Sequence, residues 1–143
     1  MNETLLNRIV ELRARLAAEP AAPLFGDIPA GSVNPQTGSP LWDDFLRVAD
    51  GARFGSVDLF SSSEISGKQF YLQGRTDALV IGQILYLPLI LDKNTGCLAL
   101  MRDDTIVDLG PCDPFIETFL LGPRYVEIEE SFVDDDWCTI VSR

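Results

Sequence analysis

The sequence contains no histidine, so the chain lacks the commonest general base, the commonest metal ligand and the usual switch near neutral pH. It has only three cysteines, at 97, 112 and 138, and none belongs to the close pair that zinc sites show. Cysteines without paired spacing argue against a disulfide framework and fit a reducing compartment.

Long hydrophobic runs are also missing. No apolar stretch approaches the roughly 20 residues of a membrane-spanning helix. The opening stretch MNETLLNRIVELRARL carries charges throughout and has no signal-peptide core or cleavage site. We therefore expect a cytoplasmic protein with no membrane contact.

Motifs for catalysis or cofactor binding are absent. The sequence has no Walker pattern, no GxGxxG loop and no GxSxG elbow. The serines of Ser61–Ser63 have no obvious base nearby and are typical of a turn. Asp103, Asp104 and Asp108 lack the glycine and distal glutamate of a calcium loop, so a charged hairpin tip is favoured. We predict no catalytic residue, no cofactor and no metal site.

Basic residues are scarce. Eleven Lys and Arg stand against 22 Asp and Glu, a net charge of −11. This balance argues against nucleic acid and against anionic membranes as partners. Residues 1–98 carry a net −3 and residues 99–143 a net −8. The acids of the second segment are Asp103, Asp104, Asp108, Asp113, Glu117, Glu127, Glu129, Glu130, Asp134, Asp135 and Asp136. This charge either serves solubility or attracts a basic partner.

With 143 residues, 46% of them hydrophobic, the chain has the size and composition of one globular domain, 1–143. Apolar residues at helical spacing predict a helix over 3–18, capped by Asn2. Ser39 followed by Pro40 marks the start of a second helix that runs to about Asp50. The segment 19–38 between them is rich in proline and glycine and predicts a long loop.

The middle of the chain changes to a strand pattern. The predicted strands are 56–60, 70–72, 78–81, 84–91, 97–101 and 105–109. A third helix is predicted with Asp113 as its cap and Pro114 at its first position, ending at Gly122 and Pro123. The tail 124–143 predicts either a helix after its three aspartates or a strand. Helices and strands in separate runs predict an α+β fold, with helices on one face of a largely antiparallel sheet of five to six strands.

The string PLWDDFLRVADGARFGSVDLFSSSEI at 40–65 resembles the SUKH superfamily, the domain typified by yeast cell-wall synthesis regulators. VIGQ at 80–83, LILDKNTGCLALMRDD at 89–104 and DPFIETFLLG at 113–122 resemble later elements of that family, so the similarity spans roughly 40–122. The chain departs from the family at Ala52, where a second glycine is usual, and in the loop 19–38.

The resemblance implies an α+β domain with a non-enzymatic binding role. Many bacterial members are immunity proteins that neutralise a cognate polymorphic toxin, often a nuclease. A basic toxin domain would suit the acidic composition. An intracellular adaptor that binds a cellular protein or peptide is the alternative, and an enzyme using carboxylates or Cys112 is least favoured.

If the charge serves binding, we expect it to form one face. Its acids would be Asp103, Asp104, Asp108, Asp134, Asp135 and Asp136. Trp137 or Tyr125 would supply an apolar anchor, although Trp137 is equally suited to close the core. The resemblance offers another region as the alternative interface, near Trp42, Asp50 and Phe54, although a core role is favoured for Trp42.

Overall fold

Three helices begin where a side chain satisfies the first turn. The Asn2 Oδ1 atom accepts from the Leu5 N–H at 2.7 Å at the start of α1 (Glu3–Ala17). The Ser39 Oγ atom accepts from the Trp42 N–H at 3.3 Å at the start of α2 (Pro40–Val48). These caps confirm the predicted starts of both helices. Asp134 caps α4 (Asp135–Val141) in the same way, so the end of the tail is helical.

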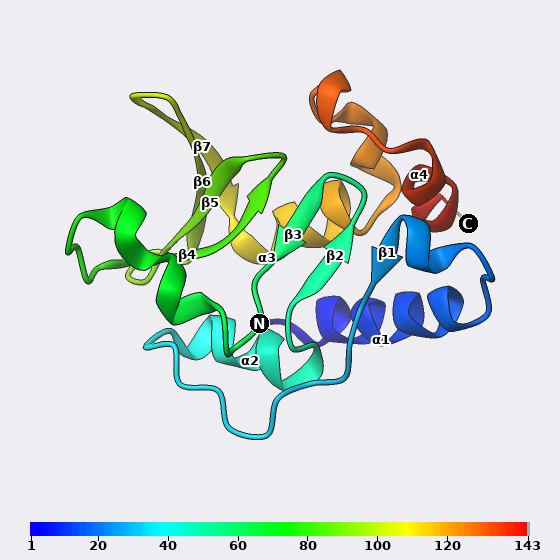
Figure 1. Cartoon of the computed structure of the whole chain (residues 1–143), viewed down its shortest axis with the longest axis horizontal. Coiled ribbons are helices and arrows are strands. Elements are labelled where there is room, and N and C mark those ends of the chain that lie inside the picture. Colours follow the sequence, from blue (N-terminus) through cyan, green and yellow to red (C-terminus); the bar gives the residue numbers. More distant parts are fainter. Residues whose placement is uncertain (143) are drawn as a thin grey trace.

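The computed structural model describes residues 1–142, and Arg143, counted above among the bases, lies outside them. It contains one seven-stranded sheet in which each strand pairs antiparallel with the next along the chain (Figure 1). The strands are β1 (Gly26–Asp27), β2 (Ala52–Phe54), β3 (Val57–Leu59), β4 (Ala78–Ile84), β5 (Leu87–Asp92), β6 (Cys97–Arg102) and β7 (Thr105–Pro111). The α+β prediction is confirmed, but the sheet has seven strands and not five to six.

Two gained strands and one lost strand explain the count, and a third difference moves the boundary between two predicted strands. The short strands β1 and β2 were not predicted. The predicted strand 84–91 is broken by a turn at Leu85 and Tyr86, which separates β4 from β5. Residues 70–72 are not a strand: they end the 3₁₀-helix η2 (Ile65–Leu72).

The segment after β7 is helical but irregular. It contains α3 (Cys112–Phe115), the π-helix η3 (Ile116–Leu120) and the 3₁₀-helices η4 (Pro123–Glu127) and η5 (Glu130–Phe132). The predicted loop 19–38 holds the short 3₁₀-helix η1 (Ala22–Leu24) and β1. Phe25 and Ile28 are buried and tie this loop to the core, whereas Leu24 is exposed.

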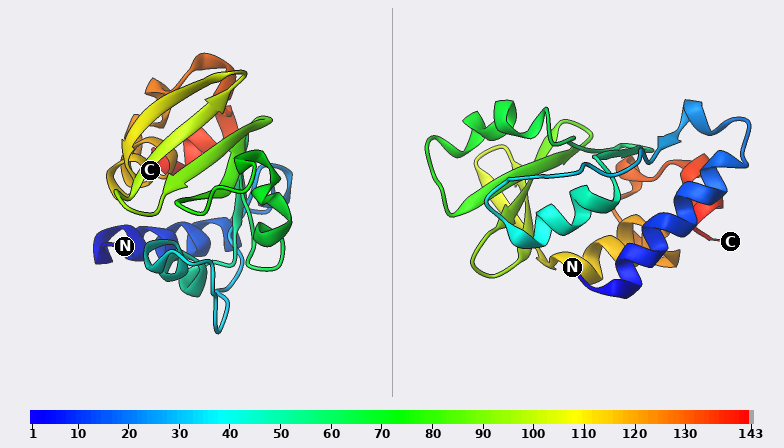
Figure 2. Two further views of the ribbon diagram at one scale, coloured as in Figure 1. Left: turned by 90° about the vertical axis from the view of Figure 1, so that its left-hand side faces the viewer. Right: turned by 90° about the horizontal axis from the view of Figure 1, so that it is seen from below.

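Helices α1 and α2 lie together on one side of the sheet, with α3 and η3 beside α1 (Figures 1 and 2). Two arginine side chains of α1 donate hydrogen bonds to backbone carbonyl groups of neighbouring segments. Arg8 donates to the Leu121 and Val141 carbonyls at 2.8 and 3.0 Å. Arg13 donates to the Ile28 and Pro29 carbonyls at 3.0 and 2.7 Å, and also to the Val48 carbonyl at the end of α2. These bonds satisfy carbonyls that the ends of elements leave open.

Within residues 1–142, none of the helices combines the length and the apolar character that crossing a bilayer requires.

Candidate partner-binding site

The described residues contain no cluster of three or more Cys, Asp or Glu side chains arranged to hold a metal ion. Cys112 is buried, and its burial raises the pKa of the thiol to about 12. The thiol is therefore protonated at neutral pH and is a poor nucleophile. The Ser61 Oγ donates to a Glu64 carboxylate oxygen at 2.8 Å, so Glu64 caps the turn predicted at Ser61–Ser63.

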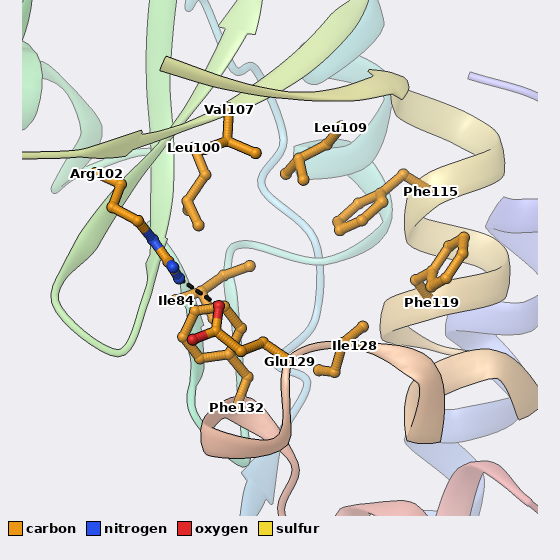
Figure 3. Close-up of a pocket in the computed structure, with 10 residues that line it drawn as sticks. All are labelled: Ile84, Leu100, Arg102, Val107, Leu109, Phe115, Phe119, Ile128, Glu129 and Phe132. Atoms are coloured by element: carbon orange, nitrogen blue, oxygen red, sulfur yellow. Dashed lines mark hydrogen bonds and ion pairs between the residues drawn. The ribbon is translucent and has the colours of Figure 1, made fainter. Parts of the chain in front are cut away.

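An apolar groove of about 360 Å³ lies between the sheet and the segment that follows β7 (Figure 3). We call it the β7 groove. Leu100, Val107 and Leu109 reach into it from β6 and β7, and Phe115 and Phe119 from α3 and η3 (Figure 3). Its remaining lining residues are Ile84, Arg102, Ile128, Glu129 and Phe132.

The aromatic rings that line the groove are held by ring stacking and by cation–π contacts. The rings of Phe115 and Phe119 lie 5.5 Å apart at an interplanar angle of 20°. The Arg124 guanidinium lies 4.4 Å from the Phe119 ring centre, and the Arg102 guanidinium 5.7 Å from that of Phe132. Each cation thus covers one ring.

The same two arginines hold carboxylates, and the pair that Arg102 forms lines the groove. Arg102 pairs with Glu129, and this pair joins β6 to the opposite wall (Figure 3). Arg124 grips Glu127 through two hydrogen bonds of 2.8 and 3.0 Å. Hydrogen bonds from these arginines lower the pKa of both glutamates, so both remain charged at neutral pH.

Strand β7 forms one edge of the sheet. Five of its seven residues are exposed and two are partly buried, and it includes the exposed apolar side chains of Ile106 and Val107. The facing side chains alternate: Val107 and Leu109 line the β7 groove, whereas Ile106 and Asp108 line a second depression on the other face of the sheet. The edge therefore offers both an unpaired backbone and apolar side chains.

The predicted acidic residues are exposed, except for the half-buried Asp134, but they do not share one face. Asp103 and Asp104 form the tip of the β6–β7 hairpin, at the same end of the groove as Arg102. Glu129 and Glu130 lie across the groove from that tip, and Figure 1 shows both segments on the upper side of the molecule. We call these four carboxylates the acidic rim. Asp108 lies on the opposite face of β7, so the prediction of a single face that includes Asp108 is wrong.

Asp134, Asp135 and Asp136 lie at the start of α4. Asp134 is the N-cap of α4, and its side chain accepts from the Trp137 N–H at 2.9 Å. Asp135 and Asp136 are exposed. Within residues 1–142, Asp103, Asp104, Asp135 and Asp136 form no ion pair.

The proposed aromatic anchors are in the core, so their assignment to a partner surface was wrong. Trp137 is fully buried, stacks on Phe54 at 4.7 Å and donates from Nε1 to the Leu120 carbonyl at 2.9 Å. Tyr125 is also fully buried, and its hydroxyl donates to the Phe132 carbonyl at 3.1 Å and accepts from the Asp134 N–H at 2.8 Å. Neither ring is accessible to a partner.

Both aromatic residues of the alternative interface are also in the core. Trp42 and Phe54 have no exposed surface, and Trp42 stacks on Phe45 at 4.4 Å. The core role favoured for Trp42 is thus confirmed. Asp50 is half-buried and accepts from the Ser62 N–H at 2.7 Å.

The β7 groove itself was not predicted. Val107 and Leu109 flank Asp108, which is a weak signal for one face of β7 because Ile106 is also apolar, and the opposing wall comes from separate segments.

The chain matches no protein-family model, and no curated protein matches it in sequence.

Proposed function

We propose that this chain is a non-enzymatic protein-binding domain of the SUKH type, acting in the cytoplasm as an immunity protein. Its partner would be a cognate toxin domain with a basic surface, such as a nuclease. Nucleic acid and anionic membrane are disfavoured as partners, because a net charge of −11 repels both.

One observation carries the proposal: exposed carboxylates without internal partners gather in the C-terminal third of the chain. Asp103 and Asp104 at the hairpin tip, and Asp135 and Asp136 at the start of α4, are exposed and form no ion pair within the described residues. A nuclease needs a basic groove for its substrate, so an acidic surface both attracts and blocks it.

The internal arginine bonds strengthen this bias. Arg8 and Arg13 are directed at backbone carbonyls of the fold, so their donors are used inside the molecule. The outer surface therefore presents fewer cations than the composition suggests.

The first test is whether a neighbouring gene encodes a large multidomain secreted protein; its C-terminal domain is then co-expressed with this chain in a bacterial host. We expect that domain to stop growth alone and growth to recover with this chain. The purified pair should associate faster than the neutral range of about 10⁵–10⁶ M⁻¹s⁻¹ at low salt. Added salt should slow association more than it speeds dissociation.

A charge-reversal pair makes the test specific. Asp103→Lys, Asp104→Lys and Asp135→Lys together should cut the association rate and its salt dependence. Reversing Glu3, Glu19 and Asp27 to Lys makes the same change in net charge on other surfaces and should have a smaller effect. If both sets of variants changed the association rate equally, the acidic residues would serve solubility and not recognition of the partner. Binding without recovery of growth would favour the adaptor alternative.

A further inference from the structure

We propose that β7 binds an extended segment of the basic partner as an eighth strand of the sheet, and that the β7 groove receives an apolar side chain of that segment. This inference rests on the proposed function and names the part of the partner that is recognised.

The backbone of β7 is available for pairing. It is the last strand of the sheet, and its seven residues span about 23 Å at roughly 3.3 Å per residue. The two-residue turn at Asp103 and Asp104 makes Arg102 and Thr105 the first hydrogen-bonded pair of the hairpin. Ile106 then opposes Met101 at a non-hydrogen-bonded position, so its N–H and C=O point away from β6. An added strand would bond to these groups.

The groove lies where side chains of an added strand would point. Alternate residues of a strand next to β7 fall on the same face as Val107 and Leu109, which line the groove. A dry cavity of about 150 Å³ holds a benzene ring. The β7 groove, at about 360 Å³, therefore has room for an aromatic side chain.

Charge selects the occupant. The acidic rim lies at one end of the groove, and Asp108 projects from the other face of β7. The matching segment alternates apolar residues, which face the groove, with Lys or Arg, which face Asp108 and the hairpin tip. A second copy of this chain fits poorly, because antiparallel pairing of two β7 strands brings Asp108 and the hairpin-tip aspartates of both copies to one edge, and like charges on adjacent strands destabilise a sheet.

The first experiment uses the synthetic peptide KVKFKVK, with KKVFVKK as a control of equal composition and broken alternation. We expect KVKFKVK to shift the amide resonances of β7 and of the groove, and to slow hydrogen exchange of the Ile106 amide. Equal binding of both peptides, or shifts confined to other surfaces, would overturn the inference.

The second experiment separates the backbone from the side chain. Ile106→Pro removes the outward N–H and leaves the ladder to β6 intact, whereas Ile106→Ala removes the side chain and keeps the N–H. For KVKFKVK and for the toxin domain, Ile106→Pro should weaken binding roughly tenfold relative to Ile106→Ala, the loss expected for a well-formed hydrogen bond. Val107→Trp should weaken binding by blocking the groove, and Val107→Ile should not.

The outcomes distinguish the two proposals. If the toxin domain binds and restores growth with Ile106→Pro as well as with Ile106→Ala, the edge inference fails and the proposed function stands. If the peptide binds at β7 and no toxin domain is neutralised, the proposed function fails. Concentration-dependent dimers in sedimentation velocity that Ile106→Pro abolishes would overturn the basic occupant in favour of a second copy.

Discussion

Strand β1, at one edge of the sheet, has two residues and lies against helices, whereas β7, at the other edge, has seven residues that remain largely exposed. A Cβ atom on Gly26 of β1 would lie 3.4 Å from a Leu16 methyl group of α1 and 3.5 Å from the Trp137 ring of α4. No comparable cover lies over the seven residues of β7, within the described part of the chain.

The difference shows two ways of managing a sheet edge. Brevity and packing protect β1. At β7, the protection is charge and irregularity: Asp103 and Asp104 at the tip, Asp108 on the strand, a register shift opposite Leu98 and Ala99, and Pro111 at the end. Charge of one sign repels further copies of the chain and still admits a basic segment, so β7 is selective where β1 is closed.

Removing the cover of the β1 edge should cause the largest loss. Trp137→Ala deletes a buried ring that stacks on Phe54, and we expect it to lower the free energy of unfolding by about 3–5 kcal/mol. Denaturant titration measures this loss. The neighbouring exposed residue Thr139 provides the control, since Thr139→Ala should have a small effect. A loss under about 1 kcal/mol for Trp137→Ala would mean that α4 does not close this edge.

The loop that follows β1 is held by Arg13. Arg13→Ala leaves the carbonyls of Ile28, Pro29 and Val48 without their donor, and we expect a loss of about 1–3 kcal/mol in thermal or denaturant unfolding. Arg47→Ala removes an exposed arginine that pairs only at the surface with Asp44, so it should cost well under about 1 kcal/mol. Similar losses for both variants would show that Arg13 contributes only as a surface charge.

Alkaline pH should lower the stability of the protein through two buried groups in the helical segment after β7, Cys112 and Tyr125. Burial raises the pKa of Cys112 from 9.0 and that of Tyr125 from 10.0, each to about 12. Unfolded chains lose these protons first, so stability is full below about pH 9 and falls as pH rises towards 12. Each group contributes at most about 1.4 kcal/mol per pH unit.

The variants assign this slope to its groups. Cys112→Ala should flatten the fall that begins near pH 9, and Tyr125→Phe the fall that begins near pH 10. Equilibrium unfolding at several alkaline pH values measures both slopes. If both variants retained the parental pH dependence, neither group would be the source.

Changes at the open edge should barely affect stability. Ile106 is 55% exposed, and Ile106→Thr keeps the branched side chain that strands favour, so we expect a change within about 0.5 kcal/mol. The same denaturant titration checks it. A loss comparable with that of Trp137→Ala would show that β7 is packed in solution and would remove the contrast between the edges.

Local signals explain which elements could be predicted. Asn2, and Ser39 with Pro40, mark their helix starts in two or three residues, and the turn 92–96 marks the hairpin of β5 and β6. By contrast, β1 has two residues, and only its long-range pairing with β2 makes it a strand. Strand β2 has three residues and pairs locally with β3 across a two-residue turn, so it is too short for a strand pattern to show. The turn after β4 was missed because Leu85 adopts a φ of 55° that usually favours glycine or asparagine.

The candidate site was predicted in part. Exposure of Asp103 and Asp104 follows from their place in a turn between two strands. The prediction that Trp137 is a surface anchor was wrong because it relied on the acidic residues next to it in sequence. Trp137 lies on the same helix face as Ile140 and Val141, and that face packs against the core. The β7 groove required tertiary structure, since its walls come from residues as distant as Ile84 and Phe132.

Both tryptophans are fully buried, each stacked on a phenylalanine, and this determines how the protein can be observed by light. Its tryptophan fluorescence will change on unfolding but will change little when a ligand binds at β7. Trp42→Phe and Trp137→Phe would each leave a single emitter, one beside Phe54 and one in α2, so that the two parts of the core can be followed separately. Tyr86 is exposed on the turn between β4 and β5, so Tyr86→Trp would add a third fluorescence signal at the surface.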